Sequence, residues 1–299
     1  MVRSTTGNEA LDRKLVDLIQ DFERTFPERI LGYFLEGSYA DQSALQTSDI
    51  DLILVFKGSF LQDEEKTRAE QLARDWEHAG QFEFDIGFCE EETLAIGVPP
   101  TLKLGSVLLY GEPLPDIYPL ISVSEWGRER THAAYWLMNK VFQRPAVVTY
   151  PLDFPEPAAE FYGYTERKVQ LANGQEVPST RDLIRVMGWM GTALVALQGE
   201  QVVPRKSDCH RLYRHHVNDE WAPFLEELYE QCRNEWRYLI PTGARERAAL
   251  RAICQRALTF ENHFLQIYKQ FLLAELTADA EERRAYALWV QEKLPLHDP

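Results

Sequence analysis

Two aspartates stand one residue apart in an otherwise apolar run, Asp49 and Asp51 in the stretch SDIDLILVF. In a β-strand, residues i and i+2 point to the same face with their Cα atoms about 6.5 Å apart, so a strand in this region brings the two carboxylates together. Carboxylates this close repel and raise each other's pKa unless a positive charge lies between them. Because Mg²⁺ prefers hard oxygen ligands, the pair indicates a divalent-metal site.

A third carboxylate is available in the stretch FEFDIGF, residues 82–88. Glu83 and Asp85 share one face of a strand there, while the aromatic residues around them take the other face. If this strand lies beside the run that follows Asp49, one of the two carboxylates comes close to the aspartate pair. We expect Asp85 to be the third carboxylate, with Glu83 as the alternative. Two divalent ions held about 3.5 to 4 Å apart can clamp an in-line phosphoryl displacement.

Gly37 and Ser38 stand upstream, at the end of another apolar run. Glycine lets the backbone approach a ligand closely, and backbone N–H groups with a serine hydroxyl can hold phosphate oxygens. We therefore expect the triphosphate of a nucleotide to bind at this turn. Taken singly, these signals are weak, because an Asp-x-Asp pair is often only the polar face of an edge strand and Gly-Ser is a common turn pair. Their order and close spacing support the interpretation.

The elements that position these residues follow from the hydrophobic pattern. Apolar residues at helical spacing predict a helix that starts after Asn8 and ends before Pro27. Runs of β-branched and aromatic residues predict four strands, at 30–37, 50–56, 82–88 and 106–111. A helix is expected over 63–79, between the second strand and the third. A further helix is expected over 122–141. We therefore expect an α/β N-terminal domain, a mixed sheet with flanking helices, over residues 1–141.

The second half of the chain has a different pattern. Residues 142–180 are rich in proline and aromatic residues, and Asn173-Gly174 predicts a hairpin with a type I′ turn, so this range is expected to be a linker or insert. From there on the apolar spacing is helical, and it predicts an all-α bundle over 181–299 with helices at 181–198, 206–216, 219–239, 243–276 and 279–293.

Composition narrows the class of protein. The chain has 299 residues, 45% of them hydrophobic, and a net charge of −15. Apolar runs fall short of the roughly 18 residues that a membrane span needs, and the N-terminus has no signal-peptide pattern, so we expect a cytoplasmic monomer with no membrane partner. The net charge of −15 argues against a nucleic-acid partner. Residues 1–150 hold 25 acidic and 14 basic residues, a balance that would attract a cationic small molecule but that is also typical of a solvated acidic surface.

The motifs together resemble a known superfamily. GSYADQSALQTSDIDLILVF, residues 37–56, has Asp49-x-Asp51 eleven residues after Ser38, and with Asp85 further on it resembles the nucleotidyltransferase superfamily of DNA polymerase beta. TRDLIRVMGWMGTALVALQGEQVVPRKSDCHRLY, residues 180–213, is similar to the helical domain of the streptomycin/spectinomycin (aminoglycoside) adenylyltransferases.

This resemblance implies a metal-dependent adenylyltransferase that moves AMP from ATP to a hydroxyl of a small acceptor, such as an aminoglycoside or aminocyclitol antibiotic. Asp49 and Asp51 would hold two Mg²⁺ ions, and Asp85 would bind one of them or act as general base. Gly37 and Ser38 would bind the nucleotide. The helical domain would close over ATP and bring a lysine to a phosphate.

The chain departs from the family in three places. The lysine turn reads Pro-Arg-Lys-Ser-Asp with an extra residue, so both Arg205 and Lys206 are candidates for the phosphate. The third carboxylate is an aspartate where the family has a glutamate. The insert over 142–180 leaves the acceptor open. An alternative is an antitoxin-type nucleotidyltransferase that binds or adenylylates a HEPN-type protein, although such antitoxins are usually single minimal domains.

Overall fold

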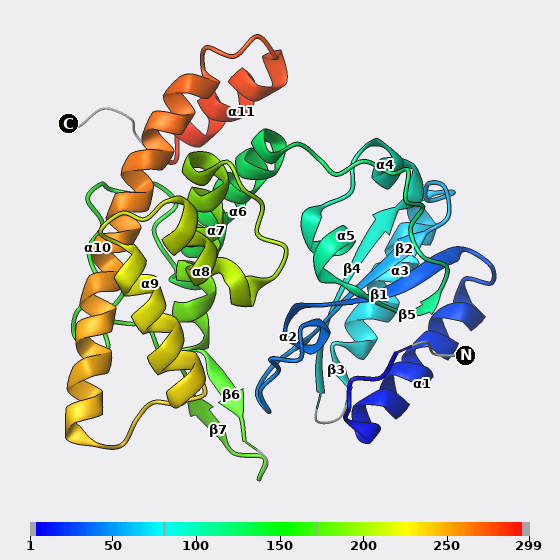
Figure 1. Cartoon of the computed structure of the whole chain (residues 1–299), viewed down its shortest axis with the longest axis horizontal. Coiled ribbons are helices and arrows are strands. Elements are labelled where there is room, and N and C mark those ends of the chain that lie inside the picture. The colour runs from blue at the N-terminus through cyan, green and yellow to red at the C-terminus, as the bar shows by residue number, and fades with distance from the viewer. Residues whose placement is uncertain (1–3, 80–81, 172, 295–299) are drawn as a thin grey trace. The chain divides into compact units, whose positions relative to one another are not determined.

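The computed structural model describes residues 4–79, 82–171 and 173–294. The chain forms two compact units (Figure 1). The first contains the chain up to Trp126 together with Val202–Asp208, and the second contains Gly127–Gln201 and the chain from Cys209 onward. These units follow packing rather than the ranges expected from the sequence, because Val202–Asp208 lies between two helices of the second unit in sequence but packs with the first.

The first unit is built on a five-stranded mixed sheet with the order β3-β4-β2-β1-β5. β2 and β4 are parallel, and the other neighbours are antiparallel. The strands are β1 (Ile30–Glu36), β2 (Ile50–Phe56), β3 (His78–Ala79), β4 (Phe82–Glu90) and β5 (Val107–Gly111). The mixed sheet and four of its strands are therefore confirmed. The short strand β3 lies in what was expected to be the end of a helix.

Helices cover both faces of this sheet (Figure 1). On one face, α1 (Glu9–Thr25) and α3 (Asp63–Trp76) pack against Leu52, Phe56 and Phe84. Asn8 caps α1, since its side chain accepts hydrogen bonds from two backbone N–H groups of the first turn. On the other face lie α4 (Glu91–Ile96) and α5 (Pro100–Gly105). The sequence pattern missed both, because a helix this short shows too few turns for its period to be seen.

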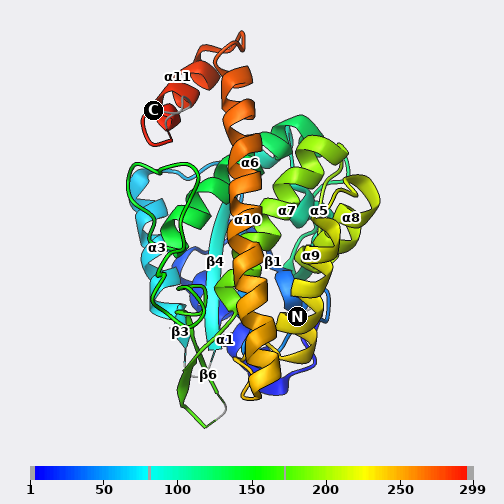
Figure 2. The same cartoon turned by 90° about the vertical axis from the view of Figure 1, so that its left-hand side faces the viewer.

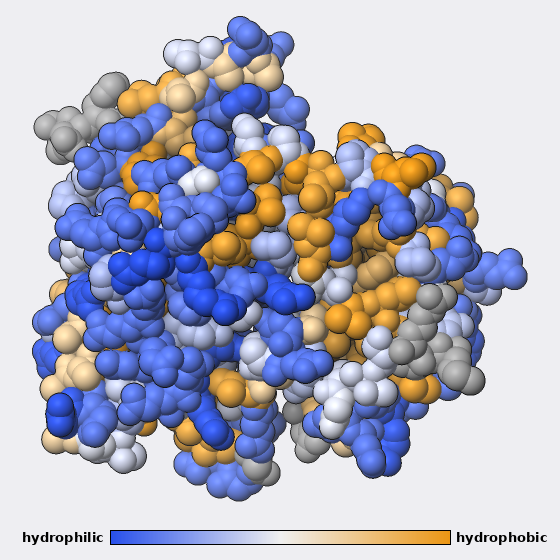
Figure 3. Space-filling view, in the orientation of Figure 1, coloured by the Kyte–Doolittle hydropathy of each residue, from blue (hydrophilic) through white to orange (hydrophobic). Residues whose placement is uncertain are grey.

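Large apolar side chains stay exposed around α4 and α5, and the orange region over these helices in Figure 3 shows where apolar residues gather. The exposed side chains here are Ile96, Leu104, Ile117 and Leu120. Exposed apolar side chains make up much of any protein surface, and this group carries no functional conclusion by itself.

The second unit is helical, as expected. Its longest helix, α10 (Ala244–Glu275), packs against α7 (Arg181–Gly199) and α9 (Ala222–Leu228), and Figure 2 shows α10 in front of them. The other helices are α6 (Val123–Val141), which begins in the first unit, α8 (Cys209–His216) and α11 (Glu281–Gln291). Within the described residues, no helix combines the length and apolar character needed to cross a membrane.

One expected helix is different in the structure. The predicted helix over 219–239 is wrong as a single α-helix, because α9 ends at Leu228 and a π-helix follows over Tyr229–Glu235. Arg237 and Tyr238 then adopt φ angles of 50° and 69°. This left-handed backbone cannot continue a right-handed helix.

The hairpin expected in the insert is present as β6 (Lys168–Gln170) and β7 (Glu176–Pro178). The type I′ assignment is wrong, however. The N–H of Gly174 donates to the carbonyl of Leu171, whereas a type I′ turn centred on Asn173-Gly174 would be closed one residue later. Gly174 has a φ of +81°, a left-handed backbone conformation that glycine adopts more easily than other residues.

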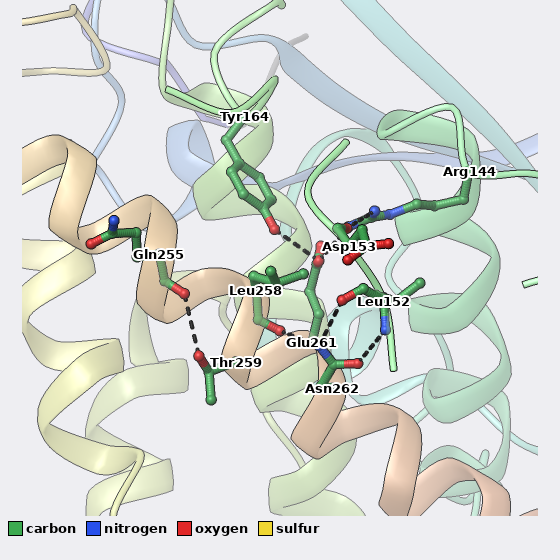
Figure 4. A network of polar contacts seen from close by, with 9 residues as sticks. All are labelled: Arg144, Leu152, Asp153, Tyr164, Gln255, Leu258, Thr259, Glu261 and Asn262. Atoms are coloured by element: carbon green, nitrogen blue, oxygen red, sulfur yellow. Dashed lines mark hydrogen bonds and ion pairs between the residues drawn. The ribbon is translucent and has the colours of Figure 1, made fainter. Parts of the chain in front are cut away.

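A buried polar network attaches the rest of the insert to α10 (Figure 4). The carboxylate of Glu261, which is fully buried, accepts hydrogen bonds from Arg144 at 2.6 Å and from the Tyr164 hydroxyl at 2.9 Å. The neighbouring Asn262 side chain accepts from the N–H of Leu152 at 2.7 Å. The irregular segment is therefore an integral part of the second unit.

Candidate functional site

Two of the predicted carboxylates lie side by side on neighbouring strands. In the parallel pairing of β2 with β4, Asp51 and Asp85 are direct partners, and partners in register point to the same face of a sheet. Both belong to the face covered further along by α4 and α5, while the face that carries Leu52 packs on α1 and α3. The expectation that residues 82–88 lie beside 50–56 is confirmed, and Asp85, rather than Glu83, is the residue opposite Asp51.

Asp49 directly precedes β2, which begins at Ile50 as expected. Asp49 is close enough to act on Asp51 electrostatically. Burial, and after it the charge of Asp49, raises the pKa of Tyr39 in the Gly37–Ala40 segment. Asp49 is therefore close to both Asp51 and the Gly-Ser segment, while the common orientation of Asp49 and Asp51 stays a prediction.

Several charged groups act on Asp51. Burial raises its pKa, the ammonium of Lys206 lowers it, and the negative charges of Asp49 and Asp85 raise it further. The side chain of Asp51 is only 17% exposed, whereas Asp85 is exposed. These carboxylates thus share one electrostatic environment in which added positive charge is favourable.

Lys206 supplies the positive charge that the structure holds there. Its Nζ atom lies 3.3 Å and 3.4 Å from the two carboxylate oxygens of Asp51. Lys206 belongs to the Val202–Asp208 segment, hereafter the strap, which is part of the first unit. Of the two basic candidates, Lys206 is the one brought to Asp51, while Arg205 is exposed.

Gly37 is required by its contact with Asp51. Its φ is +66°, and a Cβ atom at this position would come within 2.0 Å of Asp51 Oδ2. Gly37 and Ser38 do not form the simple turn expected from the sequence, because Gly37–Ala40 makes a single helical turn, α2. Glycine therefore allows the backbone to lie directly against a predicted metal ligand. Phosphate binding by these two residues stays a prediction.

The structure adds polar residues that the sequence pattern did not single out. Asp41 Oδ1 accepts hydrogen bonds from the N–H and the hydroxyl of Ser43, and Asp41 Oδ2 accepts one from the hydroxyl of Ser207. Ser207 follows Lys206 directly. Ser43 and Ser207 both lie in the motifs quoted from the sequence. The hydrogen bond between Ser207 and Asp41, however, joins residues more than 160 positions apart, and such a contact leaves no local sequence pattern.

The donor atoms suit a divalent cation. Aspartate oxygens are ligands that Mg²⁺ prefers, and the negative charges around Asp51 exceed the single charge of Lys206. Among the residues that the structure describes, however, no group of three histidine, cysteine, aspartate or glutamate side chains is spaced to hold a metal ion. The chemistry of the donors therefore fits Mg²⁺, and the three-carboxylate arrangement with Asp49, Asp51 and Asp85 stays a prediction.

Comparison with known proteins identifies the class of this unit. Residues 15–103 match the family model described as "Nucleotidyltransferase domain". The match begins within α1 and ends within α5, so it includes Gly37, Ser38 and the three aspartates but not the strap. It confirms the expected nucleotidyltransferase domain in the first unit, and a domain of this class is an enzyme domain.

The other two comparisons are less informative. No curated protein matches the sequence. Among solved structures, the chain is similar to spectinomycin adenyltransferase AAD(9) from Enterococcus faecialis, which was crystallised with ATP and spectinomycin. That similarity has 10% sequence identity and a TM-score of 0.46, and it covers 82% of this chain and 98% of that one.

Proposed function

We propose that this protein transfers AMP from ATP to a hydroxyl group of a small cationic acceptor, such as an aminoglycoside or aminocyclitol antibiotic. The observation that supports this most is the register of Asp51 and Asp85 on parallel strands within the matched nucleotidyltransferase domain. Carboxylates in this register, with the backbone of Gly37 packed against one of them, suit the binding of a phosphate-bound cation.

The carboxylates have distinct roles in this proposal. Asp49, Asp51 and Asp85 would hold Mg²⁺, which when bound neutralises the triphosphate and lowers the pKa of the acceptor hydroxyl. Asp85 is more exposed than Asp51, its partner on the neighbouring strand. It can therefore contact an acceptor that arrives from solution. Its carboxylate would take the hydroxyl proton as general base.

The phosphates would be held by other groups near Asp51. The backbone of Gly37 and the hydroxyl of Ser38 would contact phosphate oxygens. Lys206 would leave Asp51 and complement the negative charge that develops on the departing pyrophosphate. Arg205 lies next to it in the strap and is the alternative for this contact.

A cationic acceptor is supported by charge. Residues 1–150, which include all of the predicted carboxylates, hold 25 acidic and 14 basic residues. A region of this sign attracts cations and raises their local concentration. Acceptors with several ammonium groups therefore suit it better than neutral or anionic ones.

Incubation of the protein with labelled ATP and Mg²⁺ tests the proposal. The acceptors would be a panel of aminoglycosides, spectinomycin and lincosamides, and product would be scored by the mass of an added AMP group. Parallel reactions with GTP and CTP would test the nucleotide. Absence of transfer to every acceptor would remove antibiotic modification as the function.

Replacement of Asp51 tests the site itself. Asp51→Asn keeps the side-chain shape and removes the charge, so transfer should fall by about a thousandfold or more, as expected when metal-dependent charge stabilisation is lost. Its thermal unfolding should stay close to that of the wild type. Asp116→Asn, outside the site, is the matched control, and equal activity of the two variants would contradict the assignment.

A further inference from the structure

We infer that Asp41 is a positioning residue that, through Ser207, holds Lys206 over the aspartates of the site. The inference rests on the proposed function, because Lys206 is the group assigned to the phosphates. Asp41 is half-buried at the end of α2. It is assigned no contact with substrate, so its effect is transmitted through the strap.

The strap depends on contacts with the first unit to keep its place. Val203 is 2% exposed. A Cβ atom at Gly105 of α5 would come within 2.2 Å of the carbonyl oxygen of Pro204, so the two backbones are in direct contact. The Gly105–Pro204 contact holds the beginning of the strap against α5. The Ser207–Asp41 hydrogen bond fixes it on the other side of Lys206.

Asp41 is also tied to the Gly-Ser segment. Its N–H donates to the carbonyl of Gly37 at 3.3 Å. Its Oδ1 atom accepts from Ser43, whose N–H also donates to the carbonyl of Ser38 at 2.9 Å. One carboxylate thus joins the segment predicted to seat the phosphates to the segment that carries the lysine. A displacement of the Gly-Ser segment would therefore also displace the strap, and the reverse.

This connection matters because the lysine side chain cannot fix its own position. Lys206 is 63% exposed, and its ammonium sits at the end of a flexible four-carbon stem. With the backbone held on both sides, the stem has only to choose a rotamer that reaches Asp51 or, in the proposed reaction, a phosphate. Without the Ser207–Asp41 bond, the ammonium would be spread over a larger volume, and fewer conformers would reach either partner.

The first test measures Lys206 without any ligand. Wild type, Ser207→Ala, Asp41→Ala and Ser207→Thr would be labelled briefly with an amine acetylating reagent, and modification of Lys206 would be followed by peptide mass spectrometry. Ser59→Ala is the matched control, since it removes a serine hydroxyl that donates to Glu92 at 2.8 Å elsewhere in the same unit. Thermal unfolding would show which variants are folded.

We expect Lys206 to be labelled about threefold faster in Ser207→Ala and Asp41→Ala, because a hydrogen bond to a charged group is lost. Ser207→Thr keeps the hydroxyl and should behave as wild type, as should Ser59→Ala. Unchanged labelling in folded Ser207→Ala and Asp41→Ala would overturn the inference.

The second test measures ATP affinity with a non-hydrolysable analogue. Ser207→Ala should weaken binding by about fivefold, and it should weaken it no further when Lys206→Met is already present. An additive loss in the double variant would overturn the positioning role, because Ser207 would then act independently of Lys206. If the wild type binds no nucleotide while the labelling difference is observed, the positioning of Lys206 by Asp41 is supported and the proposed function is wrong.

Discussion

Asp51 experiences opposing electrostatic effects from its neighbours. Its protonated form is favoured by burial and by the negative charges of Asp49 and Asp85. The ammonium of Lys206 favours the ionised carboxylate instead. The ammonium lies within 3.4 Å of both oxygens. It therefore stands where a bound cation would compete for the same atoms. If Asp51 holds Mg²⁺ as proposed, metal binding and the Lys206 pair are alternatives at this carboxylate.

Removal of the ammonium should make this competition visible. Two unit charges about 4 Å apart near a protein surface interact by roughly 4 kcal/mol. We expect Lys206→Met to bind Mn²⁺ about tenfold more tightly than the wild type in the absence of nucleotide, only part of that interaction being recovered. Isothermal titration or Mn²⁺ electron paramagnetic resonance would measure the affinity.

Lys57→Met is the control for the loss of one positive charge. Lys57 Nζ lies 3.9 Å from Glu112 Oε1 in an exposed pair of the same unit, so this variant should leave Mn²⁺ affinity nearly unchanged. The same affinity in Lys206→Met and Lys57→Met would show that Lys206 does not compete with the metal.

Some of these residues could be found from sequence and others could not. Asp85 could be found because the period of two in a strand depends only on local sequence. Asp41 and Ser207 could not, because their hydrogen bond depends on how the strap is folded back onto α2. The bounds of β2, by contrast, agree with the strand expected over 50–56, because its apolar run begins directly after Asp49.

At the scale of elements, the first residue of α2, which follows β1 directly, is constrained by a close contact. Gly37 and Gly58 have nearly the same positive φ, +66° and +64°. They differ in what a methyl group would meet. At Gly58 the nearest atom is Glu92 Oε1 at 3.6 Å, an ordinary contact, whereas at Gly37 it is Asp51 Oδ2 at 2.0 Å.

This pair allows backbone strain to be separated from damage to the site. Gly37→Ala and Gly58→Ala should each lose about 1 kcal/mol of unfolding free energy, because alanine is disfavoured in the left-handed region. Only Gly37→Ala forces the Asp51 carboxylate to move. AMP transfer should therefore fall about a hundredfold in Gly37→Ala, as for a catalytic group misplaced by about 1 Å.

Urea unfolding and transfer assays on both variants would make the comparison. Similar stability with activity lost in Gly37→Ala alone would agree with the expectation. Equal activity in the two variants would show that Gly37 does not control the position of Asp51.

The elements themselves were largely predictable. Strong apolar periodicity gave the strands β1, β2 and β4 and the helices α1, α7 and α10 to within a few residues. The failures have physical causes. α4 and α5 are too short to show a period, the helix after α9 changes its winding, and the hairpin closes at a different residue from the expected one.

At the scale of the whole molecule, pH should act on stability through the buried network of the second unit. Burial raises the pKa of Glu261 to about 7, against the opposing effect of Arg144. The folded state therefore holds the proton of Glu261 at pH values where the unfolded chain, with a pKa near 4.5, has lost it. The contribution of Glu261 to stability is full below about pH 4.5 and is lost as the pH rises to about 7.

Glu261→Gln should remove this dependence. The unfolding free energy of the variant relative to the wild type should increase between pH 5 and pH 7, on the order of 2 kcal/mol, and stay level above pH 7. Urea unfolding followed by tryptophan fluorescence at several pH values would measure it. A constant difference over this range would contradict the expected ionisation of Glu261.

The comparison with a variant is needed because another buried group acts in the opposite sense. Burial lowers the pKa of His132 to about 4. The unfolded chain therefore binds a proton at His132 more readily, and stability from this group rises with pH between about 4 and 6.5. Since His132 is present in both proteins, its effect cancels in the difference.

The strap also affects how this sequence can be divided or exchanged. The chain leaves the first unit after Trp126, returns for Val202–Asp208 and leaves again, so no single cut separates a unit with all its parts. A gene fragment that ends at Trp126 would encode the sheet and its aspartates but not Lys206 or Ser207. Recombination at that point would thus transfer the proposed site without Lys206 and Ser207. The site stays complete only when both units are inherited together.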